Sequence, residues 1–337
     1  MTRRRVVIVL ATILALGFGA SSVVLSQSAP GKVAMLLPGS VNDQSWNAAG
    51  YAGLLKLKDT GAEIAYSENV QAADHVEAMK DYARRGFSPV IGHSGRFLSA
   101  AQRVGPEFGK TTFLVGSGSG GQANVISLDV ANEQYAYVVG VLAGKMTKTG
   151  KVGAVAGLEG LPNMIASMGG FRLGVKSVKP DAEVKIIYLQ SMEDPAAAKE
   201  ATFSLIAGGA DVIGGKLNAG HAGIIQAAKE KNVYATGRSV GHTAIAPERV
   251  LTNIDEKWAD IYVAAVTDLR AGKLTGHYIP YGYNTPTGGA DLRYSSDRAL
   301  NPVVPAAVAA ELETVKKKIA SGDLKIKPTK EDARGGV

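Results

Sequence analysis

The stretch Lys32-Val-Ala-Met-Leu-Leu-Pro-Gly-Ser-Val-Asn-Asp-Gln-Ser-Trp-Asn47 contains the pattern on which the fold depends. Its apolar run, Val33 to Leu37, predicts a buried strand, which Pro38-Gly39-Ser40 ends. Asn42 or Asp43 can then cap a helix that contains the tryptophan. A loop between a strand and a helix presents free backbone N–H groups, and open α/β sheets bind ligands at that edge. The stretch therefore predicts either a capped turn with a packed tryptophan or part of a binding site.

The alternation of strand and helix repeats along most of the chain. A first series predicts strands at 33–37, 62–66, 89–92, 112–116 and 124–128, with helices at 44–58, 72–85 and 97–104. A second series predicts strands at 151–157, 184–189, 211–214, 232–235 and 250–253, with helices at 132–147, 163–176, 195–206 and 222–230. Such βα units form parallel sheets with helices on both faces. Two series therefore predict two similar α/β lobes.

The last part of the chain departs from this alternation. A helix at 255–271 and a strand at 276–283 precede a segment rich in Gly, Thr and Pro at 284–296, which predicts a loop. A final helix is predicted at 306–320. The charged residues 328–337 predict a frayed tail.

Residues 1–28 have the pattern of a cleavable export signal. Arg3-Arg4-Arg5 form a positive start, Val6 to Ala20 an apolar run, and Ser26-Gln27-Ser28 offer small residues for cleavage. The apolar run is shorter than the ~20 residues of a membrane span, but Val23 to Leu25 could lengthen it, so an uncleaved anchor is the alternative. No cysteine is present to accept a lipid. We expect a periplasmic protein without a lipid anchor.

Charge and composition argue against several classes of function. The chain has 37 basic and 30 acidic residues, and without the three leader arginines the balance is 34 to 30, a net charge of +4. This mild excess, without a dense basic face that carries aromatic residues, gives no support for a nucleic-acid partner. The five histidines lack the spacing of a metal site, and thiols are absent. We expect no metal.

Sequence motifs of cofactor sites and of hydrolases are also missing. The glycine-rich segment Gly116 to Gly121 lacks the Gly-Lys-Ser/Thr of a phosphate-binding loop, and the pattern after it predicts a strand instead of a helix. No Gly-x-Ser-x-Gly elbow with recognisable triad partners follows a strand. We therefore expect neither a cofactor nor an enzymatic activity.

Small and polar residues gather where the predicted strands end, at 92–95, 116–121, 214–221 and 236–242. Parallel strands end at the same edge of a sheet, so two facing lobes would bring these turns together across a cleft.

Five charged or titratable side chains lie on these turns. The histidines either hydrogen-bond a ligand or occupy the surface, and the two cations, each directly after a glycine, either face a ligand or are solvated. These residues are His93, His221, His242, Lys216 and Arg238.

A series of motifs identifies a family. Asn42-Asp43-Gln44-Ser45-Trp46-Asn47 corresponds to an Asp-Asp-Lys-Ser-Phe-Asn element, and further matches in the same order are Gly92 to Phe97, Asn132-Glu133-Gln134, Gly170 to Gly174, Asp194-Pro195-Ala196 and Ala246 to Thr252. In these motifs the chain resembles the basic membrane protein family of substrate-binding proteins, which includes the purine-nucleoside receptors of bacterial ABC importers. The resemblance covers about 32–283.

The resemblance implies an α/β fold of the periplasmic-binding-protein type I, with two Rossmann-like, doubly wound lobes joined by hinge strands that close on a ligand. We expect 29–129 with 255–283 in the N-terminal lobe, and 130–254 with 284–327 in the C-terminal lobe. It further implies that Trp46 stacks on the ligand. The implied partners are a small-molecule ligand and the transmembrane subunits of an ABC permease, and we expect a monomer.

The chain departs from the nucleoside-binding members where they carry acids. Pro38-Gly39-Ser40 replaces an acid after the first strand, Ser117 replaces one after the fourth strand, and Gly237 to Gly241 replaces a Gly-x-Asp-x-Asp segment. Met192 stands at the position of the second stacking aromatic residue. Carboxylates accept hydrogen bonds from ribose and purine donors, so their loss changes the expected ligand.

With those acids gone, Arg238, Lys216 and His93 would dominate the cleft. We therefore predict a flat or compact ligand that is rich in acceptors, with a carboxylate as one option, in place of a purine nucleoside. The predicted ligand-binding residues are Asp43, Gln44, Ser45, Trp46, Asn47, His93, Ser94, Ser117, Met192, Lys216, Asn218 and Arg238.

The predicted function is that of a periplasmic solute-binding protein that serves an ABC importer. The alternatives are a periplasmic ligand sensor that signals to a receptor, a binder specific for nucleosides or nucleobases, and an exported α/β hydrolase.

Overall fold

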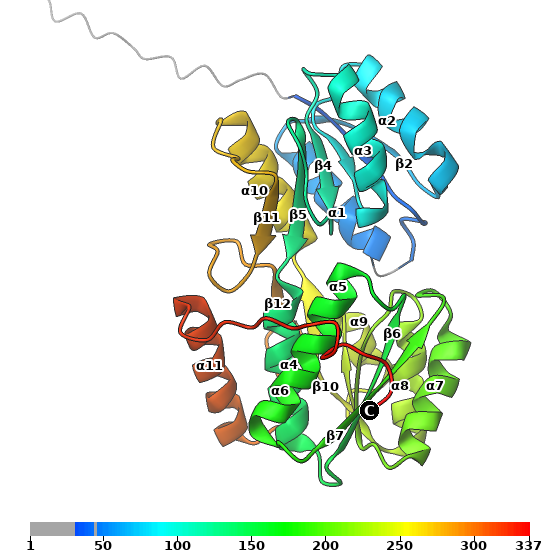
Figure 1. The fold of residues 1–337 in the computed structure, drawn as a ribbon, viewed down its shortest axis with the longest axis vertical. Coiled ribbons are helices and arrows are strands. Elements are labelled where there is room, and N and C mark those ends of the chain that lie inside the picture. Colours follow the sequence, from blue (N-terminus) through cyan, green and yellow to red (C-terminus); the bar gives the residue numbers. More distant parts are fainter. Residues whose placement is uncertain (1–30, 44–45) are drawn as a thin grey trace, which may run out of the picture.

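The computed structural model describes residues 31–43 and 46–337. It contains two lobes, each built on one six-stranded sheet, which are stacked along the long axis of the molecule (Figure 1). The predicted export signal, Gln44 and Ser45 lie outside the described residues. Within the described ranges, no helix is both long and apolar enough to cross a membrane.

The N-terminal lobe is a parallel sheet with helices on both faces. Its strands, in sheet order, are β11 (Tyr278–Tyr281), β5 (Val125–Val130), β4 (Phe113–Gly116), β3 (Val90–Gly92), β1 (Lys32–Leu36) and β2 (Glu63–Ser67). Its helices are α1 (Trp46–Asp59), α2 (His75–Arg84), α3 (Leu98–Val104) and α10 (Trp258–Arg270), with short 3-10 turns η1 (Ala72–Asp74), η2 (Gly95–Phe97) and η3 (Gly105–Glu107).

The opening strand β1 shows how the sequence produces this layering. Val33 and Met35 pack into the core under α1 and α10, whereas Ala34 and Leu36 pack into the core under α2 and α3. Successive side chains of a strand point to opposite faces of the sheet. An unbroken apolar run is therefore what a strand buried on both faces requires.

The C-terminal lobe repeats the plan with one antiparallel strand. Its strands, in sheet order, are β12 (Ala290–Arg293), β10 (Val250–Glu256), β9 (Tyr234–Gly237), β8 (Val212–Lys216), β6 (Lys151–Gly157) and β7 (Glu183–Leu189). Its helices are α4 (Asn132–Met146), α5 (Pro162–Met164), α6 (Gly170–Val178), α7 (Pro195–Ala207), α8 (His221–Lys231), α9 (Val240–Ile245) and α11 (Ala306–Ser321), with a π-helical turn η4 (Ile165–Gly169).

Helices α4 and α6 pack with their backbones in contact. A Cβ atom on Gly140 would collide with the carbonyl oxygen of Phe171, and one on Gly174 would collide with that of Tyr137. Glycine is required at both positions because any side chain would push the helices apart. This contact explains the glycine that ends the recognised motif Gly170 to Gly174.

The chain passes between the lobes three times. The crossings are between β5 and α4, between β10 and α10, and between β11 and β12. The predicted parallel α/β architecture is confirmed. The segment 284–296 was predicted as a loop but contains β12, which pairs with β10 and gains its stability from that partner. The predicted helix at 255–271 begins later, because β10 extends to Glu256.

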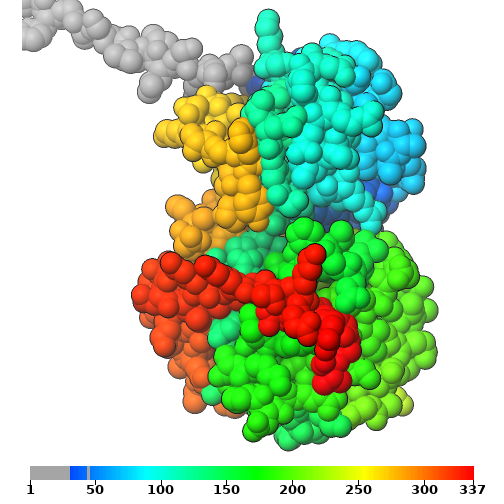
Figure 2. Space-filling view, viewed as in Figure 1, coloured from blue at the N-terminus to red at the C-terminus, as the bar shows by residue number. Residues whose placement is uncertain are grey.

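The C-terminal tail is ordered, which corrects the expectation of a frayed tail at 328–337. Arg172 on α6 donates hydrogen bonds of 2.8 to 3.3 Å to the carbonyl oxygens of Glu331, Asp332, Arg334 and Gly336. Ala333 is buried, and the tail crosses the C-terminal lobe as the red segment in Figure 2. A guanidinium that satisfies several backbone carbonyls compensates for the tail's lack of apolar residues.

We expect Arg172→Ala to release the tail. The variant removes four charge-assisted hydrogen bonds to the tail and a fifth to the Val184 carbonyl oxygen, each of which contributes about 1 kcal/mol or more. The amides of 328–337 should therefore exchange hydrogen faster and the melting temperature should fall. Hydrogen-exchange mass spectrometry measures the first effect. Arg334→Ala is the control, because the Arg334 side chain forms only an exposed pair with Glu331. Equal protection of the tail in the Arg172 variant and the wild type would contradict the role of Arg172.

Candidate ligand-binding site

A cavity of about 790 Å³ lies between the lobes at the carboxyl ends of their strands. The N-terminal lobe lines it with residues 38–40, 43, 46–47, 94–96, 117–119, 129 and 278, and the C-terminal lobe with residues 133, 158, 161–164, 166, 190–193, 216, 218 and 238. Both series of βα turns thus contribute to one cavity, as the topology of doubly wound sheets requires.

Most of the predicted binding residues line this cavity. They are Asp43, Trp46, Asn47, Ser94, Ser117, Met192, Lys216, Asn218 and Arg238. Gln44 and Ser45 lie outside the described residues. The exception is His93, which does not line the cavity.

Asp43 holds the start of α1 in place. Its carboxylate accepts hydrogen bonds from the backbone N–H groups of Asn47 and Ala48, both at 2.9 Å, and from the Asn47 side-chain amide at 2.8 Å. Asn47 in turn accepts from the backbone N–H of Gly39 at 3.1 Å. The predicted capping by Asp43 is therefore present, and it satisfies N–H groups that the first turn of a helix leaves without partners. The same bonds fix the loop that lines the cavity.

Trp46 is held by an aromatic cluster. Its indole stacks on His93 with ring centroids 4.2 Å apart and 15° between the planes, and its Nε1 donates to the His93 carbonyl oxygen at 2.9 Å. Trp258 is perpendicular to both rings, at 5.2 Å from Trp46 and 5.5 Å from His93. Because it is almost equidistant from the two, Trp258 lies beside the stack and not over it. The face of Trp46 opposite His93 is therefore the one that the indole can present to the cavity.

His93 positions Trp46 and does not contact the cavity, which corrects its prediction as a ligand-binding residue. It is 0% exposed, and its Nε2 lies 2.8 Å from the Trp46 carbonyl oxygen. That oxygen can only accept, so Nε2 carries the proton and Nδ1 accepts from the Tyr262 hydroxyl at 2.6 Å. Burial lowers the pKa of His93 to about 4, which keeps the ring neutral.

The other two turn histidines are also internal. His221 and His242 pack against each other with ring centroids 4.9 Å apart, and neither lines the cavity. Nε2 of His221 lies 2.9 Å from the Thr236 carbonyl oxygen, and Nδ1 of His242 accepts from the backbone N–H of Arg238 at 3.0 Å. Burial lowers the pKa of both. They support the turn that carries Arg238.

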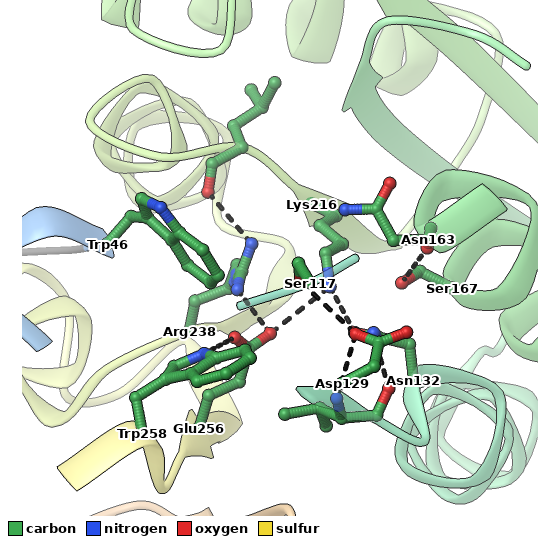
Figure 3. Close-up of polar contacts among 12 residues, drawn as sticks. Trp46, Ser117, Asp129, Asn132, Asn163, Ser167, Lys216, Arg238, Glu256 and Trp258 are labelled. Carbon is green, nitrogen blue, oxygen red and sulfur yellow. Dashed lines mark hydrogen bonds and ion pairs between the residues drawn. The ribbon is translucent and has the colours of Figure 1, made fainter. Parts of the chain in front are cut away.

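Two of the three cations that line the cavity, Lys216 and Arg238, share one carboxylate that sequence reasoning missed. Oε1 of Glu256 accepts from Lys216 Nζ at 3.2 Å and from Arg238 Nη2 at 2.6 Å, while Oε2 accepts from Trp258 Nε1 at 2.7 Å (Figure 3). Burial by itself raises the pKa of Glu256, but Lys216 and Arg238 outweigh it and hold the pKa at about 2. Lys216 and Arg238, which we expected to reverse the polarity of the cleft, therefore have a carboxylate between them.

A second carboxylate, Asp129, faces the cavity from the end of β5. It accepts hydrogen bonds from the Tyr278 hydroxyl at 3.1 Å and the Ser117 hydroxyl at 3.3 Å. Burial raises the pKa of Asp129 to about 7, although the nearby positive charge of Lys216 acts in the opposite direction. Lys216 also donates to the Asn132 side-chain oxygen (Figure 3). Hydrogen-bond donors and acceptors thus adjoin each other on one wall of the cavity.

These groups provide an aromatic face with hydrogen-bond donors and acceptors, which suits the binding of a small molecule. The described residues contain no group of three His, Cys, Asp or Glu side chains that could hold a metal ion. Lys216, Arg238 and Glu256 satisfy one another, and His93 is shielded from the cavity. The site offers an aromatic face and a polar wall, as a reversible ligand requires.

Comparison with known proteins identifies the family of this chain. The model of the family described as "ABC transporter substrate-binding protein PnrA-like" matches residues 31–329. The chain belongs to this family. Its members are substrate-binding proteins and not enzymes, and they act outside the cytoplasmic membrane.

Among the relatives, the "Transcriptional activator protein med" of Bacillus subtilis is 28% identical over 258 residues, which is 75% of this chain and 80% of the relative. The "Purine-binding protein BAB2_0673" of Brucella abortus is 29% identical over 202 residues, which is 60% of this chain and 57% of the relative. A solved solute-binding protein of an ABC transporter system from Conexibacter woesei superposes with a TM-score of 0.70 at 26% identity, covering 88% of this chain and 99% of the other. The predicted periplasmic-binding-protein type I fold and the family resemblance are confirmed.

The site residues that sequence reasoning missed include four with acidic or phenolic side chains. Asp129 and Tyr278 lie on neighbouring strands whose carboxyl ends face the cavity. They could have been found by extending the predicted strand at 124–128 and pairing it with the one at 276–283. Glu133 was recognised as part of a helix start but not as a cavity residue. Glu256 was assigned to a helix, which hid its position at the end of β10.

The pH dependence of stability should reveal Asp129. Because its folded pKa is raised, the folded state keeps a proton that the unfolded chain loses above about pH 4. The contribution of the protonated Asp129 to the free energy of unfolding is therefore complete below about pH 4 and is lost as the pH rises through 7. Relative to Asp129→Asn, the wild type should lose up to about 1.4 kcal/mol per pH unit across this window.

Chemical denaturation of both proteins at pH 5, 6, 7 and 8 measures this difference. A free-energy difference between wild type and variant that stays constant across the series would show that Asp129 has an ordinary pKa.

Proposed function

We propose that this protein captures a small flat solute between its lobes and delivers it to the transmembrane subunits of an ABC import permease. Membership of a substrate-binding family supports the transport role. The proposal includes export to the periplasm with removal of the leader 1–28, the absence of a lipid anchor, and action as a monomer. The lobes divide near residues 129, 255 and 283, and the three crossings serve as the hinge that closes on the solute.

The position of Trp46 is the observation that supports a planar ligand. His93 supports one face of the indole, and the other face is available to a planar molecule in the cavity. A molecule stacked there can direct one edge toward Asp129, which accepts hydrogen bonds, and toward Lys216, which donates them. Nucleobases carry acceptors and donors side by side on such an edge.

The balance of charges favours a nucleobase over an anion or a nucleoside. A carboxylate on the ligand was one option because Arg238 and Lys216 were expected in the cleft, and Glu256 already supplies a carboxylate to both. In the segment where the nucleoside-binding members carry the acid that holds ribose hydroxyls, this chain has Ser239 and Gly241 at the acid positions. We keep the expectation of a flat ligand that is rich in acceptors. The Brucella relative is named as a purine-binding protein, which supports the same ligand class.

Isothermal titration calorimetry with adenine, guanine, hypoxanthine, adenosine, guanosine and nicotinate tests the ligand class. We expect a nucleobase to bind more tightly than its nucleoside and than nicotinate. Trp46→Ala should weaken that binding by roughly five-fold to a hundred-fold, because stacking on an aromatic ring contributes about 1–3 kcal/mol per base.

Trp46→Phe is the matched variant, because it keeps a ring for stacking but loses the bond to the His93 carbonyl oxygen. It should recover most of the affinity that Trp46→Ala loses. Tighter binding of nucleosides than of nucleobases would reject the proposed class, and equal affinities of wild type and Trp46→Ala would reject the stacking role.

Delivery to a permease is tested in the cells that make the protein. Deleting its gene should abolish uptake of the labelled ligand identified by calorimetry, and restoring the wild-type protein should recover it. Restoring the Trp46→Ala variant should recover less. Unchanged uptake in the deletion strain would contradict the transport role.

A further inference from the structure

Glu256 does not line the cavity, but it accepts hydrogen bonds from Lys216 and Arg238, which do. It lies at the carboxyl end of β10, at one of the crossings between the lobes, with 7% of its side chain exposed. Lys216 and Arg238, both of which line the cavity, are 9% and 11% exposed. All three charges are therefore largely removed from water, so each depends on the others for compensation.

The hydrogen bonds leave Glu256 little freedom. One carboxylate oxygen accepts from both cations and the other accepts from Trp258, which lies beside the Trp46–His93 stack. Since the carboxylate is anchored from the N-terminal lobe by Trp258, it cannot follow either cation toward a ligand without losing that bond. It is a fixed counter-ion and not a mobile one.

We propose that Glu256 determines the charge selectivity of the cleft, so that the site accepts an uncharged ligand and rejects an anion of the same shape. This inference rests on the proposed function, in that the cleft binds a flat solute. The cavity is lined by three cations, Arg96, Lys216 and Arg238, and by the carboxyl groups of Asp43, Asp129, Glu133 and Glu193, and Glu256 adds a further negative charge beside Lys216 and Arg238. An anion that enters gives up its hydration, meets a site without net positive charge, and is repelled by Glu256.

Removing the carboxylate should reverse this preference. In Glu256→Gln the two cations keep their places beside the cavity but lose their fixed counter-ion. A buried cation without compensation is unfavourable, and an anionic ligand would then supply the missing charge. A merely structural Glu256 would behave differently, because its loss would weaken the binding of neutral and anionic ligands alike.

Nicotinamide and nicotinate form a suitable pair of probes, because they share a flat ring and differ in charge. Ligand-observed NMR with wild type and Glu256→Gln gives the affinity of each. We expect the ratio of nicotinate to nicotinamide affinity to rise by about tenfold or more in the variant. Binding of nicotinate to the variant alone also supports the proposal. An unchanged ratio, or no binding of nicotinate to either protein, overturns it.

Two further variants act as controls. Glu248→Gln removes an exposed glutamate that does not line the cavity and should leave the ratio as in the wild type. Arg238→Gln keeps Glu256 but removes one cation, so it should weaken nicotinate more than nicotinamide. It also supplies the test if Glu256→Gln does not fold, and equal weakening of the two probes would then overturn the proposal.

The outcome is separable from that of the nucleobase titrations. If no nucleobase binds, the proposed ligand class fails, yet the ratio for the two probes still reports on Glu256. If a nucleobase binds while the ratio is unaffected by Glu256→Gln, the ligand class stands and the role of Glu256 is rejected.

Discussion

One buried carboxylate connects the groups on which the cleft depends. Glu256 accepts hydrogen bonds from Lys216 and Arg238 in the C-terminal lobe and from Trp258 in the N-terminal lobe. Trp258 in turn packs beside the Trp46–His93 stack. The polar wall and the aromatic wall of the cavity therefore meet at a single side chain, located where the chain crosses between lobes. A fully partnered charge of this kind favours one arrangement over others more than it adds stability.

The fold could be predicted because short stretches of sequence are enough to indicate its strands and helices. The run Val33 to Leu37 indicates a strand buried on both faces, and its repetition indicates a parallel sheet. The errors fall where structure depends on distant partners. β12 is a four-residue strand that exists through pairing with β10. The end of β10 was mistaken for a helix start, because acidic residues such as Asp255 and Glu256 are also typical of a helix N-terminus.

The sequence predicted at which edge of the sheets the site lies, but not how its side chains are arranged. The rule that ligands bind at the carboxyl ends of parallel strands located Trp46, Lys216 and Arg238 on the cavity. It does not say which way a side chain on a turn points. His93 turns inward between Trp46 and Tyr262, and Glu256 approaches its cations from a strand of the same sheet. Pairings between residues distant in sequence decide the charge of the site, and a single sequence does not contain them.

The ordered tail affects how accessible one sheet edge is to other chains. β7 is the outermost strand of its sheet, and an exposed strand edge is a template for pairing with another chain. Gly336 pairs with Ile186 of β7, donating to and accepting from its backbone at 2.8 and 2.9 Å. The last residues therefore cover part of the β7 edge, whose backbone groups could otherwise pair with another chain. A chain shortened at its C-terminus would leave this part of the β7 edge open to pairing with another chain.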